Sequence, residues 1–161
     1  MIIIKPLAKK NIRQIKPLIE KLRIYEESHY GTKFNFELIN KSGLEAYYRH
    51  HVKNEFGKKH GFIFVAYDGS KQIGYTSGWI EKQPRGVVVV DKVGYLSDLY
   101  VDDKYRNKGL GKKLLQTAKS WFKKQGLKFM DIVCYATNPS QKLYRRVGFS
   151  DYWIGLRMRL K

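Results

Sequence analysis

The fold of this chain is decided where a strand runs through a short loop into a helix, in the stretch Val101-Asp102-Asp103-Lys104-Tyr105-Arg106-Asn107-Lys108-Gly109-Leu110-Gly111. The residues before this loop form a largely apolar, strand-like run from Tyr95 to Val101. The residues after it repeat apolar side chains at helical spacing up to Gly126, a typical helix stop. That apolar face consists of Leu110, Leu114, Leu115, Ala118, Trp121 and Phe122. We therefore expect a strand–loop–helix unit.

The loop has the chemistry of an anion site. The first backbone N–H groups of a helix have no partner within it, and the helix dipole favours negative charge there. Gly109 and Gly111 would let a phosphate approach the backbone closely, although two glycines at a helix start also serve tight packing alone. From Lys104 to Lys128 there are nine basic residues and no acidic one. This segment therefore favours an anionic ligand without naming it.

Toward the N-terminus, the sequence predicts a strand, two helices and a hairpin. Met1 to Pro6 is expected to be a strand rather than a signal peptide, because its lysines follow the apolar residues. Asn11 is expected to cap a helix that Pro17 kinks or restarts, and a capping box at Ser42-Gly43-Leu44-Glu45 opens a second helix ending near Gly57. The hairpin comprises residues 62–67 and 72–81 with a turn at Asp68-Gly69, and a further sheet segment, residues 87–101, is expected to be interrupted near Gly94.

Toward the C-terminus, the pattern alternates strand, helix and strand. Residues 129–135 predict a strand, Asn138-Pro139 predicts the capped start of a short helix ending at Gly148, and residues 152–160 alternate as a final strand. A hairpin followed by strand–helix–strand predicts an α/β (α+β) fold with a mixed sheet covered by helices. A length of 161 residues fits one domain spanning residues 1–161.

Composition limits the classes of function. No apolar run reaches the roughly 20 residues of a membrane span, so no membrane role is expected. The single cysteine, Cys134, favours a reducing, cytoplasmic setting and a small buried hydrophobe over a nucleophile. The four histidines and one cysteine show no metal-ligand pattern, and neither the Walker nor the dinucleotide glycine pattern is present. The net charge of +18 leaves a basic nucleic-acid-binding module as an alternative, although no motif of that class appears.

Two motifs resemble those of the GNAT N-acetyltransferase superfamily. The stretch from Val101 to Gly111 resembles its motif A, and Leu143-Tyr144-Arg145-Arg146-Val147-Gly148-Phe149 resembles its motif B. The two lie about one helix and one strand apart, and the order of elements from Met1 to Leu160 is similar throughout. The resemblance implies a largely antiparallel mixed sheet with helices on both faces.

The resemblance also implies a reaction and a set of site residues. Acetyl-coenzyme A would place its pyrophosphate on the loop amides of Arg106, Asn107, Lys108, Gly109, Leu110, Gly111 and Lys112. Its pantetheine arm would pair like a strand with Leu99, Tyr100 and Val101, and Thr137, Asn138 and Ser140 would line the cofactor. A neutral primary amine would attack the thioester directly, and Tyr144 would protonate the departing thiolate. Without the motif around it, Tyr144 would fit better as a core tyrosine packed against the sheet.

Two departures from the family pattern matter. The asparagine usual seven residues before the tyrosine is Thr137 here, so Asn138 is either a cofactor contact or only a helix cap. The glutamate that often serves as general base on the motif A strand has no counterpart at Tyr95 or Ser97. Asp98 is the candidate base if a bulge turns it to the right face, with a structural acid as the alternative and Glu81 as a further candidate.

The acceptor stays open among polyamines, protein amines, amino acids and other small amines. A polyamine would need an acidic groove, for which Glu26, Glu27 and Glu37 are the available acids. A GNAT-fold cofactor binder with altered catalysis is a further alternative. The family often dimerises, so a homodimer is also compatible with the resemblance.

Overall fold

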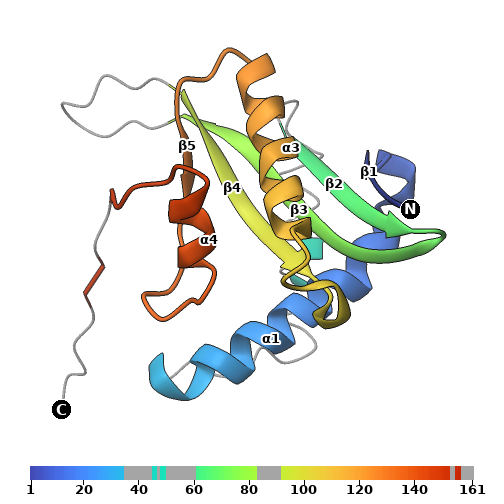
Figure 1. Ribbon diagram of the computed structural model, residues 1–161, viewed down its shortest axis with the longest axis horizontal. Coiled ribbons are helices and arrows are strands. Elements are labelled where there is room, and N and C mark those ends of the chain that lie inside the picture. Colours follow the sequence, from blue (N-terminus) through green and yellow to red (C-terminus); the bar gives the residue numbers. More distant parts are fainter. Residues whose placement is uncertain (35–44, 47, 50–60, 83–91, 153–154, 157–161) are drawn as a thin grey trace.

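The computed structural model describes residues 1–34, 45–46, 48–49, 61–82, 92–152 and 155–156 (Figure 1). Five strands form one sheet in the order β1-β2-β3-β4-β5. Neighbouring strands are antiparallel except β4 and β5, which are parallel. The strands are β1 (Ile2–Pro6), β2 (Gly61–Asp68), β3 (Lys71–Lys82), β4 (Lys92–Val101) and β5 (Met130–Ile132). This confirms the mixed, largely antiparallel sheet.

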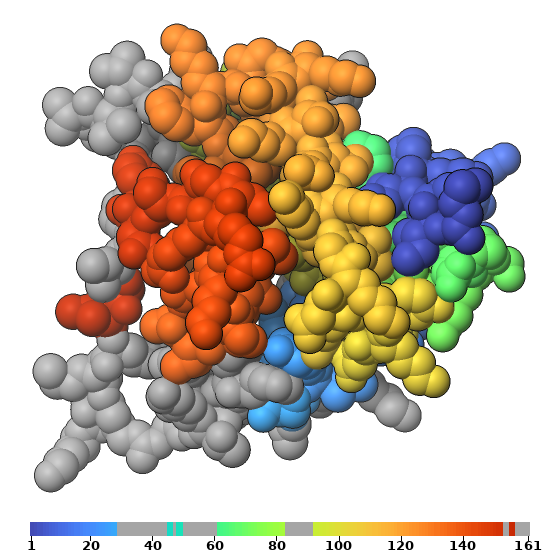
Figure 2. All heavy atoms as spheres, in the orientation of Figure 1, coloured from blue at the N-terminus to red at the C-terminus, as the bar shows by residue number. Residues whose placement is uncertain are grey.

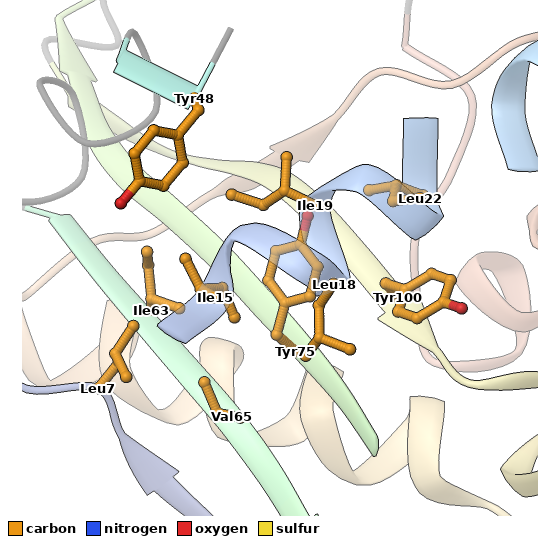
Figure 3. Packing of buried hydrophobic residues seen from close by; sticks show 10 residues of the cluster. All are labelled: Leu7, Ile15, Leu18, Ile19, Leu22, Tyr48, Ile63, Val65, Tyr75 and Tyr100. Atoms are coloured by element: carbon orange, nitrogen blue, oxygen red, sulfur yellow. The ribbon is translucent and has the colours of Figure 1, made fainter. Parts of the chain in front are cut away.

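The helices lie on both faces of this sheet, as the resemblance implied. They are the 3-10 helices η1 (Lys9–Ile15) and η3 (Asp103–Tyr105) and the α-helices α1 (Lys16–Phe34), α3 (Leu110–Lys124) and α4 (Gln141–Arg146). On one face, η1 and α1 bury Ile15, Leu18 and Ile19 against strand residues such as Val65 and Tyr75 (Figure 3). On the other face, α3 buries Leu114, Leu115 and Phe122, which follow the helical apolar spacing of the sequence.

The N-terminal helix begins earlier than predicted. Asn11 lies inside η1, whose N-cap is Ala8, because the chain first makes tight 3-10 turns that bring Ile15 into the core. Pro17 is the second residue of α1, so the helix restarts there as expected, at a position where proline needs no N–H partner. Of the helix predicted from Ser42, only residues 45–46 and 48–49 are described, and they are helical. The remainder lies outside the described residues.

The interruption expected near Gly94 is wrong, and the irregularity lies three residues later. Gly94 lies within the continuous strand β4, and its lack of a side chain leaves room for α3, because a Cβ there would lie 2.5 Å from the Phe122 ring. The register instead shifts at Ser97, since Ser77 pairs with Asp98 while Gly78 pairs with Leu96. Ser97 is therefore the extra residue of a β-bulge. Residues 87–91 of the predicted segment lie outside the described residues.

Two C-terminal predictions need correction. β5 covers only Met130–Ile132 and not residues 129–135, because its pairing with β4 ends at Leu96. The described part of the predicted last strand, residues 152 and 155–156, is not in a strand, and Leu156 is 93% exposed. The rest of that segment lies outside the described residues.

Candidate active site

The loop between β4 and α3 has the backbone of an anion site. Asn107 has φ of 60° and Gly109, the N-cap of α3, has φ of 80°, so two residues adopt the left-handed conformation. The Lys113 N–H donates to the Gly109 carbonyl at 3.1 Å, which is the first bond of the helix. The amides of residues 110–112 precede that bond and belong to the free first turn. Left-handed turns of this kind gather N–H groups around a concavity that suits an anion.

The two loop glycines have different roles. A Cβ at Gly109 would meet no atom within 4 Å, so the space beside it is open to a ligand. A Cβ at Gly111 would lie 3.1 Å from Leu143 Cδ2 of α4. Gly111 therefore allows α3 and α4 to pack closely, and Gly109 is the loop glycine with open space beside it.

Arg106 holds the loop in place instead of reaching outward. Its Nε donates to the Val101 carbonyl at 3.0 Å, and its Nη2 pairs with Asp103 at 2.7 Å. Its guanidinium also lies over the ring of Tyr25 in α1, 4.3 Å from the centroid. The side chain is thus engaged with protein groups, and the exposed positive charge at the loop includes Lys104, Lys108 and Lys112.

Beyond the bulge, β4 has an edge that β5 does not cover. β4 pairs with β5 only from Gly94 to Leu96, so from Ser97 onward no described strand pairs with that edge. Leu99 and Val101 point toward α3, and Tyr100 is buried against α1. Figure 2 shows the surface hollowed between the atoms of the β4–α3 loop, in yellow, and those of the α4 region, in orange and red. An extended ligand could add to this edge as a strand does.

The α4 side of this edge carries the residues predicted from motif B. Tyr144 is 7% exposed and packs with Leu96 and Leu115, and its ring meets that of Phe149 edge-on at 5.9 Å. Asn138 Oδ1 accepts the Ser140 N–H at 2.8 Å, so its side chain closes the turn before α4. The helix itself starts later than predicted, at Gln141, with Ser140 as its N-cap. Thr137 is exposed in the same turn.

The bulge brings Asp98 to the face that α1 covers. Asp98 is 3% exposed, and its Oδ2 accepts the Tyr75 hydroxyl at 2.6 Å while its Oδ1 pairs with Arg23 Nη2 at 3.0 Å. A carboxylate with both oxygens engaged and so little exposure is poorly placed to receive a proton from a substrate. Glu81, the other predicted candidate, is exposed near the end of β3.

Burial and nearby charge shift several pKa values around this edge. Burial raises the pKa of Glu26, and the charge of Asp98 adds to the rise while Arg23 opposes it. Burial also raises the pKa of Tyr95, with smaller contributions from Glu81 and Asp98. Hydrogen bonding from Lys21 lowers the pKa of Asp102. Burial raises the pKa of the Cys134 thiol, which favours the less reactive protonated form.

Arg23 of α1 was not predicted as a site residue, and Glu26 was predicted only as an acid available to line an acceptor groove. Arg23 continues the buried spacing of Ile15 and Ile19 at four-residue intervals, and Glu26 follows buried Leu22 by four residues. A charged residue that continues an apolar helical stripe is a signal for a buried ion pair, since charges there must be matched. This signal was present in the sequence, but the partner, Asp98, depended on the bulge.

Comparison with known proteins identifies the pattern. Residues 23–149 match the family model described as the Acetyltransferase (GNAT) family. Solved structures with similar folds include aminoglycoside N-acetyltransferase AAC(6')-Iy in complex with the bisubstrate analog CoA-S-monomethyl-acetylneamine (TM-score 0.73, 17% identity, 100% of this chain and 99% of that one). They also include the aminoglycoside 6'-N-acetyltransferase AAC(6')-IG from Acinetobacter haemolyticus (TM-score 0.72, 17% identity, 99% of this chain and 98% of that one). A third is a tetramutant of a Bacillus halodurans protein (TM-score 0.78, 17% identity, 98% of this chain and 99% of that one). No curated protein matches the sequence.

At these identities the structural likeness concerns the fold alone. None of the helices in the described part of the chain is both long and apolar enough to cross a membrane.

Proposed function

The chain belongs to the GNAT acetyltransferase family, and from this premise we propose that it transfers the acetyl group of acetyl-coenzyme A to a primary amine by direct attack. One observation carries the proposal: an open, left-handed glycine turn at the start of α3 lies at the end of a strand edge that β5 leaves uncovered. This combination offers an anion site and a strand-pairing site side by side. Acetyl-coenzyme A has a pyrophosphate and an amide-containing arm in the same order.

The loop would hold the phosphates through backbone groups. The amides of Leu110, Gly111 and Lys112 would donate to phosphate oxygens, with Gly109 leaving room for their approach. The exposed side chains of Asn107, Lys108 and Lys112 would add hydrogen bonds and positive charge. Arg106 would contribute by fixing the loop rather than by contacting the ligand with its side chain.

The edge of β4 would hold the pantetheine arm. Leu99 and Tyr100 offer backbone groups beyond the point where β5 stops pairing. The Val101 carbonyl is already engaged by Arg106, so this residue would contribute less to the pairing. Thr137, Asn138 and Ser140 form the facing turn, and the Asn138 side chain serves primarily to close that turn.

Tyr144 would assist the departing thiolate. Its ring is buried between α4 and the sheet and is fixed by Phe149, so its position is well determined by packing. A phenol within reach of the sulfur could donate its proton or stabilise the developing charge, which typically accelerates a reaction about 10²–10⁴-fold.

The acceptor is proposed only as a class, an amine-bearing small molecule, peptide or protein. Aminoglycosides enter as candidates because two of the structurally similar enzymes are named for them. The test is a panel of amines that includes aminoglycosides, polyamines, amino acids and peptides, read by release of free coenzyme A thiol. Release that depends on both acetyl-coenzyme A and an amine would support the proposal. A protein stabilised by oligonucleotides and not by acetyl-coenzyme A would contradict it.

A further inference from the structure

A single guanidinium links two carboxylates from distant parts of the chain. Arg23 of α1 pairs through Nη1 with Glu26 Oε2 at 2.6 Å and through Nη2 with Asp98 Oδ1 at 3.0 Å. Asp98 also accepts the Tyr75 hydroxyl at 2.6 Å. Side-chain exposure rises along this line from 2% at Asp98 through 17% at Arg23 to 28% at Glu26. The network therefore leads from the core of the sheet toward the surface and ends on Glu26.

The network lies where the open edge of β4 begins. Asp98 follows the Ser97 bulge directly, at the point where β5 has stopped pairing. Two further contacts hold α1 along the same part of β4 and its loop: Lys21 pairs with Asp102 at 2.9 Å, and Arg106 lies over Tyr25. Glu26 is thus held close to the edge where the thioester arm is proposed to lie.

Glu26 is the carboxylate best suited to accept a proton there. Asp98 has both oxygens engaged, Asp102 is bonded to Lys21, and Asp103 is an exposed partner of Arg106. In the part of the chain that the structure describes, Glu26 is anchored through Oε2 alone. Its other oxygen can face an incoming amine while the anchor fixes the direction of the side chain.

We propose, resting on the acetyl transfer proposed above, that Glu26 is the general base for the attacking amine and that Arg23 and Asp98 position it. The nitrogen lone pair forms a bond to the acetyl carbonyl carbon, and the carbon–sulfur bond breaks. The proton shed by the nitrogen passes to the Glu26 carboxylate, and the thiolate takes a proton from Tyr144. Transfer of a proton from Glu26 to Tyr144 through solvent restores both residues.

The surroundings of Glu26 favour this role. Burial and the charge of Asp98 on β4 both raise its pKa, and Arg23 on α1 partly opposes them. A carboxylate with a raised pKa holds a proton more firmly than an ordinary glutamate, and it is therefore the stronger base near neutral pH. The anchor from Arg23 keeps that base in place without fully cancelling the shift.

The first test compares Glu26→Gln with Glu20→Gln, a second glutamate on α1 that has no role in the network. Glu26→Gln should lower kcat/KM about 10²–10⁴-fold while leaving acetyl-coenzyme A affinity nearly unchanged, and Glu20→Gln should behave as wild type. Glu26→Asp should retain part of the rate, because it keeps a carboxylate at a shorter reach. Full kcat/KM in Glu26→Gln would overturn the assignment.

The second test follows kcat/KM with pH for two acceptors whose amines have different pKa values. The amine must be neutral to attack, so one acidic limb of the kcat/KM profile should shift with the pKa of the acceptor amine. A second acidic limb, from the titration of Glu26, should stay at the same pH for both acceptors. Glu26→Gln should abolish the fixed limb. Asp98→Asn removes a charge that raises the Glu26 pKa, so it should move the fixed limb to lower pH. An unmoved limb in a folded Asp98→Asn variant would refute the positioning role.

The outcomes separate this inference from the proposed function. If none of the amines in the panel causes the wild-type protein to release thiol, the acetyl transfer is overturned and the assignment of the base with it. A wild-type protein that turns over, and whose rate and pH profile survive Glu26→Gln, would overturn the base alone.

Discussion

Gly109 offers a sharp test of the phosphate site, because the chain contains a matched control. Gly109 and Gly126 stand at opposite ends of α3 with φ of 80° and 77°, and a Cβ at either would meet no atom within 4 Å. An alanine in the left-handed region is strained by about 1–2 kcal/mol. Gly109→Ala and Gly126→Ala should therefore destabilise the free protein by similar amounts.

The size of the effect follows from the length of the chain. For a domain of 161 residues, each kcal/mol shifts the melting temperature by about 2–4 °C, so each variant should melt about 2–8 °C lower than wild type. Acetyl-coenzyme A at about 100 times its Kd should stabilise the wild type by about 2.7 kcal/mol, or roughly 5–11 °C. Gly126→Ala should keep that ligand-induced rise, because its methyl group is far from the loop.

Gly109→Ala should lose most of that rise. Its methyl group would occupy the open space beside the amides of residues 110–112, where the phosphate oxygens are proposed to lie, and a tenfold loss of affinity corresponds to about 1.4 kcal/mol. The assay is a thermal shift titration of the three proteins with acetyl-coenzyme A. Equal ligand-induced shifts in Gly109→Ala and Gly126→Ala would refute the placement of the phosphate site.

Three further predictions concern catalysis, packing and pH. Tyr144→Phe should lower kcat and kcat/KM by similar factors in steady-state kinetics, while the affinity for acetyl-coenzyme A hardly changes. An unchanged kcat, measured where chemistry is rate-limiting, would make Tyr144 a packing residue. Gly111→Val should lower the free energy of unfolding by about 1–3 kcal/mol, because even the Cβ of the new side chain would lie 3.1 Å from Leu143. Denaturant unfolding of the double variant Gly111→Val/Leu143→Ala should show that part of this loss is recovered, and no recovery would argue against this contact. Asp102→Asn should destabilise the protein by about 1–3 kcal/mol at pH 7. Lys21 lowers the pKa of Asp102 in the folded state, so wild-type Asp102 stabilises the protein fully above its unfolded pKa of about 3.9. The urea midpoints of the wild type and Asp102→Asn should therefore converge as the pH falls through the lowered folded-state pKa of Asp102.

Local chemistry in the sequence was sufficient for most of the architecture. The helical spacing from Leu110 to Phe122 predicted both the extent of α3 and its buried face, because periodicity depends only on neighbouring residues. The hairpin at Asp68-Gly69 was predicted for the same reason, since its turn residues and strand alternation are local. The loop at Gly109 was also predicted locally, because a left-handed turn before a helix favours glycine.

The tertiary structure alone decided which face each candidate site residue would take. The bulge at Ser97 turns Asp98 toward α1, and a bulge depends on the register between β3 and β4, which no short stretch encodes. Gly111 packs against Leu143, 32 positions later, so its role depends on how closely α3 and α4 approach. Arg23 and Glu26 follow the buried stripe of α1, but the pairing of Arg23 with Asp98 exists only because a residue 75 positions away is brought beneath that helix. Local propensity thus determined the elements, and long-range packing determined the chemistry that they bring together.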